Sequence, residues 1–402
     1  MTNGSERGLA APLRIDAEYL TRTLARLVRT SSINPAFGNG TTNEREIADV
    51  VAAECERLGM RVAHYEPEPG RTSVVGTLPG SGGGRSLLLY AHVDTVGVEG
   101  MPDPFSGDVR DGRLYGRGAY DMKSGLAACF AAVEALRSAG GQLAGDLSIA
   151  AVADEEVASI GMADVLHHVR TDAAVVTEAT ELRLCLAHKG FCWIEVVTEG
   201  RAAHGSRFEE GIDANIRMGR VLAELDVLEQ RLRGSTAHRL VGPPSLHAAV
   251  LQGGTGASTY ASSCRLEIER RMIPGETVVQ VVGEIQAIID RLASADPTFR
   301  ATARSLLARE SFEARPDGVI ATVIGDAAAA VLRRPVETIG EPYWMDAALL
   351  AAAGIDTAVI GPSGAGAHAA EEWVELASVA TLAEILARTA MAYCGGTRLF
   401  AA

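Results

Sequence analysis

The feature that most constrains the fold is a set of short apolar runs without the alternation of a half-exposed strand. The run LLLYAHV covers residues 87–93, and similar runs cover residues 147–153 and 173–176. A strand of this kind is buried on both faces, so helices must cover both sides of its sheet. Segments between the runs, such as residues 122–140, are typical of helices. Strands that alternate with helices predict an α/β fold.

The composition is typical of a globular protein and does not favour binding to polyanions. The chain has 402 residues, a length that favours two domains, and 47% of its residues are hydrophobic. A formal net charge of −14 argues against nucleic acid and anionic membranes as partners. No long uninterrupted apolar stretch and no apolar signal core are found, so we expect no membrane span, no secretory signal and a cytoplasmic location.

The cysteines show no metal-binding or disulfide pattern. None of them has CxxC spacing, and most lie in apolar or strand-like contexts. The six residues are Cys55, Cys129, Cys185, Cys192, Cys264 and Cys394. We therefore expect buried, reduced thiols rather than disulfides or zinc ligands.

The pattern changes at about residue 190. From there the expected order of elements is β-α-β-β-α-β, which is typical of a ferredoxin-like α+β domain. The α/β pattern resumes after Pro316. We therefore predict a discontinuous catalytic domain, residues 1–188 and 309–402, with a central mixed sheet flanked by helices. The inserted domain would cover residues 189–308.

Acidic and histidine residues follow the apolar runs. His92 and Asp94 end the first run, Glu155 and Glu156 follow the second, and Glu178 follows the third. Ligands of α/β sheets bind beyond the carboxyl ends of the strands. Histidine and carboxylate side chains are the types that bind divalent metals through nitrogen and oxygen. Their shared placement predicts an active site and is not expected of residues that serve only the core.

Several further motifs occur in a fixed order along the chain. They are HVDTV, GRGAYDMKSG, DEE, HGS in the insert, RMIPGE and GAGAH. With these motifs the chain resembles the M20 family of metallopeptidases and deacylases, which includes acetylornithine deacetylase, succinyl-diaminopimelate desuccinylase, carboxypeptidase G and aminoacylase. The resemblance covers nearly the whole chain. It implies amide hydrolysis at a two-metal centre and an insert that acts as lid and dimerisation domain.

The resemblance also implies a set of metal ligands. They are His92, Asp121, Glu156, Glu178 and His368. Asp121 would bridge two metals, because a carboxylate has two oxygens to share. Zinc is the expected metal, and cobalt or manganese could substitute, because nitrogen and oxygen ligands select weakly among them. Few protein ligands for each metal leave room for a shared water.

Other residues receive roles from the resemblance without binding metal. Glu155 would be the general base, and Asp94 would hydrogen-bond the second ring nitrogen of His92. His204 would cross the interface of a homodimer and stabilise the oxyanion in the partner's active site. Arg271 would pair with the carboxylate of the substrate through its guanidinium fork.

Two of these assignments have plainer alternatives. His204 could be an ordinary turn residue, and Arg271 could pair with Glu269 on its own sheet. The segment GASTYASSC departs from the family pattern, because Ser258 and Thr259 stand where many relatives have an asparagine turn. The substrate-binding role of that asparagine is therefore not carried over.

The resemblance also has consequences for the backbone. It implies a cis peptide bond between Tyr120 and Asp121. The glycines Gly361, Gly364 and Gly366 are expected to shape the loop before His368, where plain turns are the alternative.

The function predicted from these residues is two-metal hydrolysis of an amide bond in a small N-acyl amino acid or a dipeptide-like compound. A dipeptidase, an aminopeptidase or a hydrolytic deaminase of an aromatic amine would use the same scaffold. A metal-free binding protein that has kept the fold is a more distant alternative. It is disfavoured because Glu155 and the whole ligand set are present.

Overall fold

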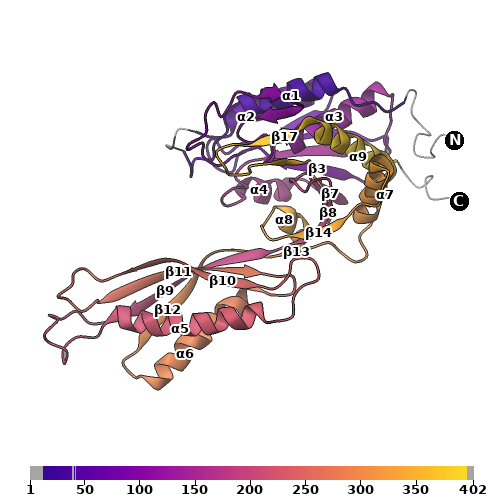
Figure 1. The fold of residues 1–402 in the computed structure, drawn as a ribbon. Coiled ribbons are helices and arrows are strands. Elements are labelled where there is room, and N and C mark those ends of the chain that lie inside the picture. The colour runs from indigo at the N-terminus through magenta and orange to yellow at the C-terminus, as the bar shows by residue number, and fades with distance from the viewer. Residues whose placement is uncertain (1–11, 39, 41, 396–402) are drawn as a thin grey trace. The chain divides into compact units, whose positions relative to one another are not determined.

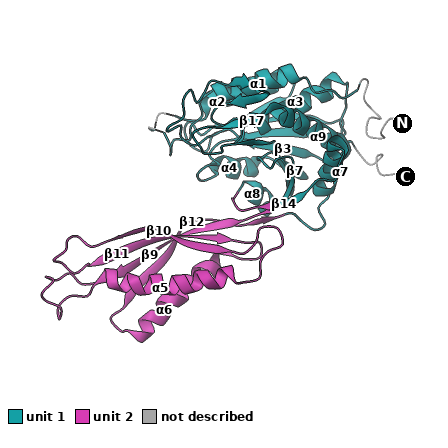
Figure 2. Cartoon of the chain, viewed as in Figure 1, with its two compact units in different colours: residues 1–186, 314–339, 345–402 teal, residues 187–313, 340–344 magenta. Residues whose placement is uncertain are grey.

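Two compact units make up the molecule (Figure 2). The computed structural model describes residues 12–38, 40 and 42–395. Unit 1 is drawn from residues 1–186, 314–339 and 345–402, and unit 2 from residues 187–313 and 340–344. Unit 2 therefore extends a few residues beyond the predicted insert at each end and gains a short second segment.

That second segment, residues 340–344, belongs to unit 2 through contacts with residues distant in sequence. The main-chain N–H of Lys189 donates to the oxygen of Glu341 at 3.1 Å. The indole N–H of Trp344 donates to the main-chain oxygen of Glu310 at 3.0 Å. Hydrophobic periodicity reports local structure only, so it could not reveal this return of the chain.

A mixed sheet forms the centre of unit 1 (Figure 1). Its strands pair in the order β1 (Arg61–Tyr65), β2 (Ser73–Leu78), β6 (Leu147–Val152), β3 (Leu87–His92), β7 (Ala173–Val176), β15 (Asp356–Val359) and β8 (Leu184–His188). Strand β3 runs parallel to both neighbours, β6 and β7, whereas β1, β2 and β8 pair antiparallel. Every residue of β3 is buried. The predicted mixed α/β sheet is confirmed.

Helices cover this sheet on both faces, as buried strands require. They are α1 (Ala17–Arg29), α2 (Arg45–Arg57), α3 (Lys123–Ser138), α4 (Ile160–His168), α7 (Ile320–Leu332), α8 (Ala347–Ala352) and α9 (Leu376–Cys394). Helices α1, α3 and α9 pack against one another on one face, and α4 and α8 lie on the other (Figure 1). The Ala-rich helix α3 is buried along most of its length, because its small side chains allow close packing.

A second, smaller sheet joins two distant segments of unit 1. Its order is β16 (Gly364–Ala365), β17 (Trp373–Glu375), β5 (Arg113–Tyr115) and β4 (Asp108–Arg110). Strands β17 and β5 pair antiparallel, with Trp373 opposite Tyr115. This pairing places the loop after β5 beside the loop before β17, and each loop carries a predicted metal ligand.

Unit 2 has the predicted β-α-β-β-α-β order. Its elements are β9 (Gly190–Glu199), α5 (Ala214–Arg233), β10 (Ser245–Gly253), β11 (Ser263–Met272), α6 (Val278–Ala295) and β12 (Arg300–Arg309). The antiparallel sheet has the order β10-β11-β9-β12, and α5 and α6 pack on one face of it. Alternate residues of β9 and β11 meet these helices in an apolar core that includes Ile194, Leu266, Val221 and Ile285. The predicted ferredoxin-like architecture is confirmed.

The remaining strands lie where the chain passes between the units. They are β13 (Phe312–Glu313) and β14 (Thr338–Glu341), together with β8. The six cysteines are buried, as predicted, and none of them forms a disulfide in the structure. Within the described part of the chain, no helix is long and apolar enough to cross a membrane.

Candidate metal centre

Three candidate ligands lie at neighbouring carboxyl ends of the central strands. His92 is the last residue of β3, Glu156 follows β6, and Glu178 follows β7. Strands β6 and β7 flank β3 on either side and run parallel to it, with His92 opposite Val152. Parallel neighbours end at the same edge of a sheet, so these side chains meet there.

The other two candidate ligands come from loops that the smaller sheet brings together. Asp121 lies in the loop between β5 and α3, and His368 lies in the loop between β16 and β17. Strands β5 and β17 pair directly. Residues far apart in sequence therefore approach the same edge of the central sheet.

Asp121 connects two histidines through its two carboxylate oxygens. Its Oδ1 lies 3.2 Å from Nε2 of His92, and its Oδ2 lies 3.3 Å from Nε2 of His368. Each histidine also has a carboxylate of its own. Oε1 of Glu178 lies 3.4 Å from Nε2 of His92, and Oε2 of Glu156 lies 3.0 Å from Nε2 of His368. The five residues form two groups that share one carboxylate.

This donor set fits a pair of divalent cations. Among the residues that the structure describes, ligand atoms of His92, Asp121 and Glu156 lie within 4.8 Å of one another, as do those of His92, Glu155 and Glu178. Imidazole nitrogen and carboxylate oxygen suit zinc, cobalt and manganese. A carboxylate whose oxygens face different histidines has the arrangement of a bridging ligand.

Glu155 lies at the margin of this cluster. Its Oε2 is 4.0 Å from Nε2 of His92, whereas the nearest oxygens of Asp121 and Glu178 are 3.2 and 3.4 Å away. A polar separation of this size leaves space for a bridging water. Distance thus distinguishes Glu155 from the two closer carboxylates.

Negative charge dominates the cluster. Burial raises the pKa of Glu155 well above the usual carboxyl range and also raises the pKa of Glu178. Burial and the charge of Asp121 raise the pKa of Glu156 to about 7. Hydrogen bonds with Asp121 and Glu156 raise the pKa of His368 to about 10. Acids and bases that both retain protons indicate a site that attracts positive charge, which divalent cations can supply.

The histidine–carboxylate pairs also shift their own titration. Burial lowers the pKa of His92, but the charge of Glu178 and the hydrogen bond with Asp121 outweigh burial and raise the pKa well above that of free imidazole. Burial raises the pKa of Asp121, but hydrogen bonds with His368 and His92 outweigh it and leave the pKa below the usual range. The carboxylate of Asp121 therefore stays ionised in the cluster.

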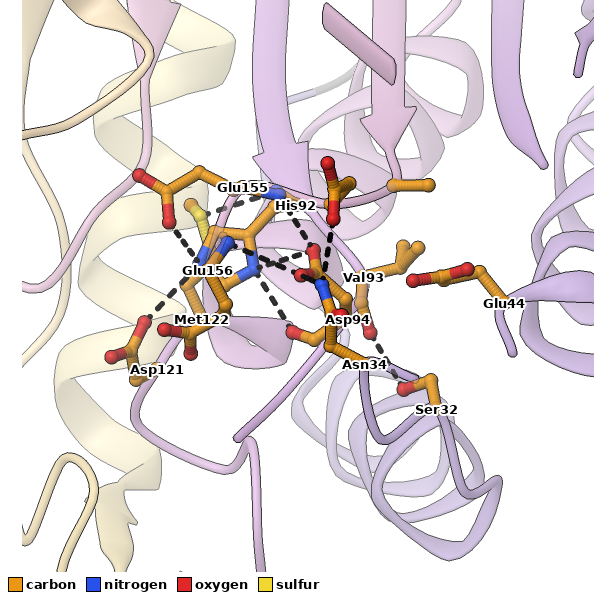
Figure 3. Close-up of polar contacts among 12 residues, drawn as sticks. Ser32, Asn34, Glu44, His92, Val93, Asp94, Asp121, Met122, Glu155 and Glu156 are labelled. Atoms are coloured by element: carbon orange, nitrogen blue, oxygen red, sulfur yellow. Dashed lines mark hydrogen bonds and ion pairs between the residues drawn. The ribbon is translucent and has the colours of Figure 1, made fainter. Parts of the chain in front are cut away.

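Asp94 holds the main chain of the predicted base and its neighbour (Figure 3). Its Oδ1 accepts the N–H of Glu155 at 3.0 Å, and its Oδ2 accepts the N–H of Glu156 at 3.2 Å. Its contact with His92 differs from the expectation, because Nδ1 is 3.0 Å from the main-chain oxygen of Asp94 and 3.6 Å from the carboxylate. A carbonyl oxygen only accepts, so Nδ1 carries the proton and Nε2 faces the carboxylates.

Asn34 was not identified from the sequence. Its Nδ2 donates to Asp94 Oδ2 and to Asp154 Oδ1, both at 2.9 Å. Asp154 also accepts a bond of 2.7 Å from Arg71, whose guanidinium makes two bonds of 2.8 Å to Glu44. The partners of Asn34 lie 60 and 120 residues away, so no local pattern could indicate them.

His204 and Arg271 lie in unit 2, whereas all the candidate ligands lie in unit 1. His204 is exposed, its main chain bridges to Thr259, and its Nδ1 lies 2.8 Å from the hydroxyl of Ser206. Arg271 lies on β11, with Nη2 2.7 Å from Oε1 of Glu269. The ion pair that the sequence offered as an alternative for Arg271 is thus present.

One peptide bond beside the centre is cis. It joins Asp121 to Met122. The resemblance had implied the preceding bond, between Tyr120 and Asp121, so that expectation was wrong by one residue.

Glycines shape the loop that carries His368. Gly366 has a φ of +88°, and a Cβ there would lie 1.8 Å from the main-chain oxygen of Glu371. A Cβ on Gly361 would lie 1.9 Å from the main-chain oxygen of Glu178. A Cβ on Gly364 would likewise lie 2.4 Å from the main-chain oxygen of Trp373, so a side chain would clash with backbone at all three positions.

The sequence profile of "Peptidase family M20/M25/M40" matches residues 88–392, which include every candidate ligand. The chain belongs to this family. It is therefore a metallohydrolase that acts on C–N bonds, as the resemblance implied.

Two curated relatives of this M20 protein act on different amides according to their names. The acetylornithine deacetylase of Myxococcus xanthus is 30% identical over 333 residues, which cover 81% of this chain and 85% of the relative. The N-formyl-4-amino-5-aminomethyl-2-methylpyrimidine deformylase of Bacillus subtilis (strain 168) is 31% identical over 273 residues, which cover 63% of this chain and 64% of the relative.

Solved structures share the fold of the M20 chain. The aminopeptidase PepT from Bacillus cereus ATCC 10987 has a TM-score of 0.78 at 18% identity, covering 94% of this chain and 98% of that one. The YXEP protein of Bacillus subtilis, described as a dinuclear metal binding peptidase of the M20 family, has a TM-score of 0.74 at 16% identity, covering 95% and 100%. At these identities the similarity is one of fold.

Proposed function

We propose that this M20 hydrolase uses two divalent cations to cleave the amide bond of a small N-acyl amino acid or a dipeptide-like compound. The observation that carries the proposal is Asp121, whose two oxygens lie 3.2 and 3.3 Å from two different histidines. Zinc is the proposed metal, with cobalt or manganese as substitutes. When bound, the cations polarise the scissile carbonyl and lower the pKa of a water.

Glu155 is the proposed general base. It would accept a proton from the attacking water and pass that proton to the leaving amine. Its main-chain N–H is fixed by Asp94, and its carboxylate lies 4.0 Å from Nε2 of His92. The side chain is thus held next to the cluster at a distance suited to a water in between.

Two residues of unit 2 complete the proposal. His204 would act in the active site of the partner protomer of a homodimer, where its imidazole would donate a hydrogen bond to the oxyanion. The exposure of His204 supports a role outside the core of its own unit. Arg271 would bind the substrate carboxylate, and its ion pair with Glu269 keeps the guanidinium on the exposed side of β11.

The relatives suggest which amides to test first. Similarity to an acetylornithine deacetylase over 85% of that relative supports an N-acyl amino acid as the substrate. A second candidate is the removal of a formyl group from an aminopyrimidine, favoured by 31% identity to the deformylase. Both reactions break a C–N bond and release a carboxylate and an amine.

The test is a hydrolysis assay on a defined panel. Protein loaded with zinc and the same protein stripped with a chelator would be offered N-acetylornithine and other N-acetyl amino acids, dipeptides and the formylated aminopyrimidine. Released amine would be measured alongside the metal content. We expect turnover of at least one amide by the zinc-loaded protein alone, with two metals bound for each chain.

Two results would contradict the proposal in different ways. Equal turnover by stripped and zinc-loaded protein would refute the metal mechanism. Two bound metals without hydrolysis of any amide or formamide would refute the substrate class, and release of ammonia from aromatic amines would then identify a deaminase.

A further inference from the structure

We propose that Glu372 is a positioning residue that supports one of the two metal subsites by holding the loops that carry Asp121 and His368. This inference rests on the two-metal function proposed above. The His368 subsite comprises His368, Glu156 and Oδ2 of Asp121. The His92 subsite comprises His92, Glu178 and Oδ1 of Asp121.

The carboxylate of Glu372 accepts four hydrogen bonds from the loop that carries Asp121. Its side chain is fully buried. Oε1 accepts the main-chain N–H groups of Tyr120 and Asp121 at 2.8 and 3.0 Å. Oε2 accepts the N–H of Gly118 at 3.1 Å and a guanidinium N–H of Arg117 at 2.6 Å. Both oxygens are used, and one of them fixes the backbone of the bridging ligand itself.

Arg117 extends this hold to the loop that carries His368. Its Nη2 donates to the main-chain oxygen of Ala369, the residue after His368, at 3.0 Å. Its Nε donates to the oxygen of Gly97 at 2.9 Å. Arg117 is only 3% exposed, so its guanidinium group is fixed in this position. Glu372 and Arg117 together tie three loops at the edge of the central sheet.

The two subsites differ in what supports them. His92 ends β3, and Glu178 follows β7, so the main-chain ladder of the central sheet places both. Asp121 and His368 lie on loops, and no strand of that sheet carries either of them. The buried Glu372–Arg117 pair holds these loops in place, as strand pairing holds His92 and Glu178 in place.

The substitution Glu372→Gln tests this role with minimal change in shape. A glutamine keeps one acceptor oxygen but places an NH2 group where the second oxygen accepts N–H donors. One pair of donors then faces another donor, and the charge opposite Arg117 is lost. Removing a buried partner of a ligand lowers metal affinity by about 10- to 100-fold.

Metal binding is measured by calorimetric titration of the stripped full chain with zinc and by metal analysis after dialysis. We expect wild type to bind two ions. In Glu372→Gln we expect the affinity of the His368 subsite to fall by about 10- to 100-fold, because both of its loop residues lose support. The affinity of the His92 subsite should fall less, because it shares only Asp121 with those loops. Excess zinc should restore the second ion and the turnover that depends on it.

Glu54→Gln is the matched control. Glu54 is also a buried carboxylate, accepting the hydroxyl of Tyr19 at 2.6 Å and the Nε–H of Arg57 at 2.8 Å, but none of these residues belongs to the metal centre. We expect this variant to lose thermal stability and to bind both ions as wild type does. Equal loss of metal in both variants would assign Glu372 a general structural role and overturn the inference.

The outcomes separate this inference from the proposed function. Wild type that binds fewer than two ions would contradict the two-metal function itself. Wild type with two ions and Glu372→Gln with two ions of unchanged affinity would overturn the positioning role alone. If Glu372→Gln does not fold, Arg117→Lys decides, because it keeps a positive charge but loses the fork to Ala369. Unchanged binding of both ions by Arg117→Lys would equally overturn the proposal.

Discussion

The candidate functional residues of unit 1 are buried or half-buried apart from His368, which is exposed, whereas in unit 2 His204 is exposed and Arg271 is half-buried. The carboxylate of Asp94 is fully buried and accepts N–H groups from three residues, two of them main-chain groups of the Glu155–Glu156 pair. His204 is exposed, and its ring bonds locally to Ser206. Buried hydrogen bonds thus hold the candidate metal centre of unit 1, whereas the proposed role of His204 and Arg271 in unit 2 is to contact the substrate.

This contrast has a physical basis. Metal ligands must be held close together against their own charge repulsion, and strand pairing and buried hydrogen bonds both contribute to that. A group that binds substrate must be reachable from solvent. Changes of the metal ligands and their buried partners in unit 1 should therefore alter metal binding or stability, whereas changes of His204 and Arg271 in unit 2 should alter kinetics alone.

The largest effect expected is that of Glu155→Gln, which sharpens the comparison within unit 1. Loss of a general base lowers kcat by about 10²- to 10⁴-fold. Both metals should remain bound, because Glu155 lies farther from His92 than Asp121 and Glu178 do. Steady-state kinetics and metal analysis of the same sample measure both quantities.

The adjacent residue provides the control. Glu156→Gln should lose metal as well as activity, because Oε2 of Glu156 lies 3.0 Å from Nε2 of His368. If Glu155→Gln loses a metal and Glu156→Gln does not, the roles of the two glutamates are exchanged.

The next effect is that of His204→Ala in unit 2. Removal of one oxyanion donor lowers kcat by about 10²- to 10³-fold. Metal content and melting temperature should not change, because the side chain is exposed and its hydrogen bonds are local. His247→Ala, at another exposed histidine of unit 2, serves as the control and should leave kcat unchanged.

Mixing two inactive variants tests whether His204 acts across a dimer. In a mixed dimer of His204→Ala and Glu155→Gln, one of the two sites regains both groups. Random pairing of equal amounts should then restore about a quarter of wild-type activity, because half of the dimers are mixed and each has one intact site. No recovery after confirmed exchange of subunits would place His204 in the site of its own chain or outside the reaction.

Arg271→Ala should have a smaller effect, mainly on KM. A hydrogen-bonded contact with a charged group contributes about 1.5–3 kcal/mol, so KM should rise about 10- to 100-fold. Substrate analogues without the carboxylate should be affected much less. Arg265→Ala, on the same strand and paired with Glu195, is the control. Equal effects of the two changes would leave only a structural role for Arg271.

The smallest effect on activity is expected from Asn34→Ala, which tests the buried network of unit 1. Two carboxylates, those of Asp94 and Asp154, each lose a bond of 2.9 Å. The free energy of unfolding should fall by about 1–3 kcal/mol, with a modest loss of metal affinity. Chemical denaturation measures the first quantity.

The control for that change is Asn43→Ala, at an exposed residue whose side chain accepts the N–H of Arg45. This variant should change stability by less and leave metal affinity unchanged. If Asn34→Ala has the same stability and metal binding as wild type, the network does not support the metal centre. The contrast between the two units would then lose its basis.

Much of the architecture could be predicted because it depends on local pattern. Strand β3 is apolar at successive positions and is buried throughout, and the order of elements in unit 2 follows from their separate periodicities. His92, Glu156 and Glu178 could be grouped because each follows a run that reads as a buried strand. The segment 340–344 could not be assigned to unit 2, because only distant contacts place it there.

By itself the sequence determined the family, the fold class and the residue types available for metal binding, because each is expressed in short motifs and in hydrophobic periodicity. The tertiary structure alone showed that Asn34 joins Asp94 to Asp154 and that Glu372 holds the backbone of Asp121. These bonds link residues 60 to 251 positions apart. Hydrogen bonds depend on distance and direction in space, and that geometry exists only after the strands and loops have packed.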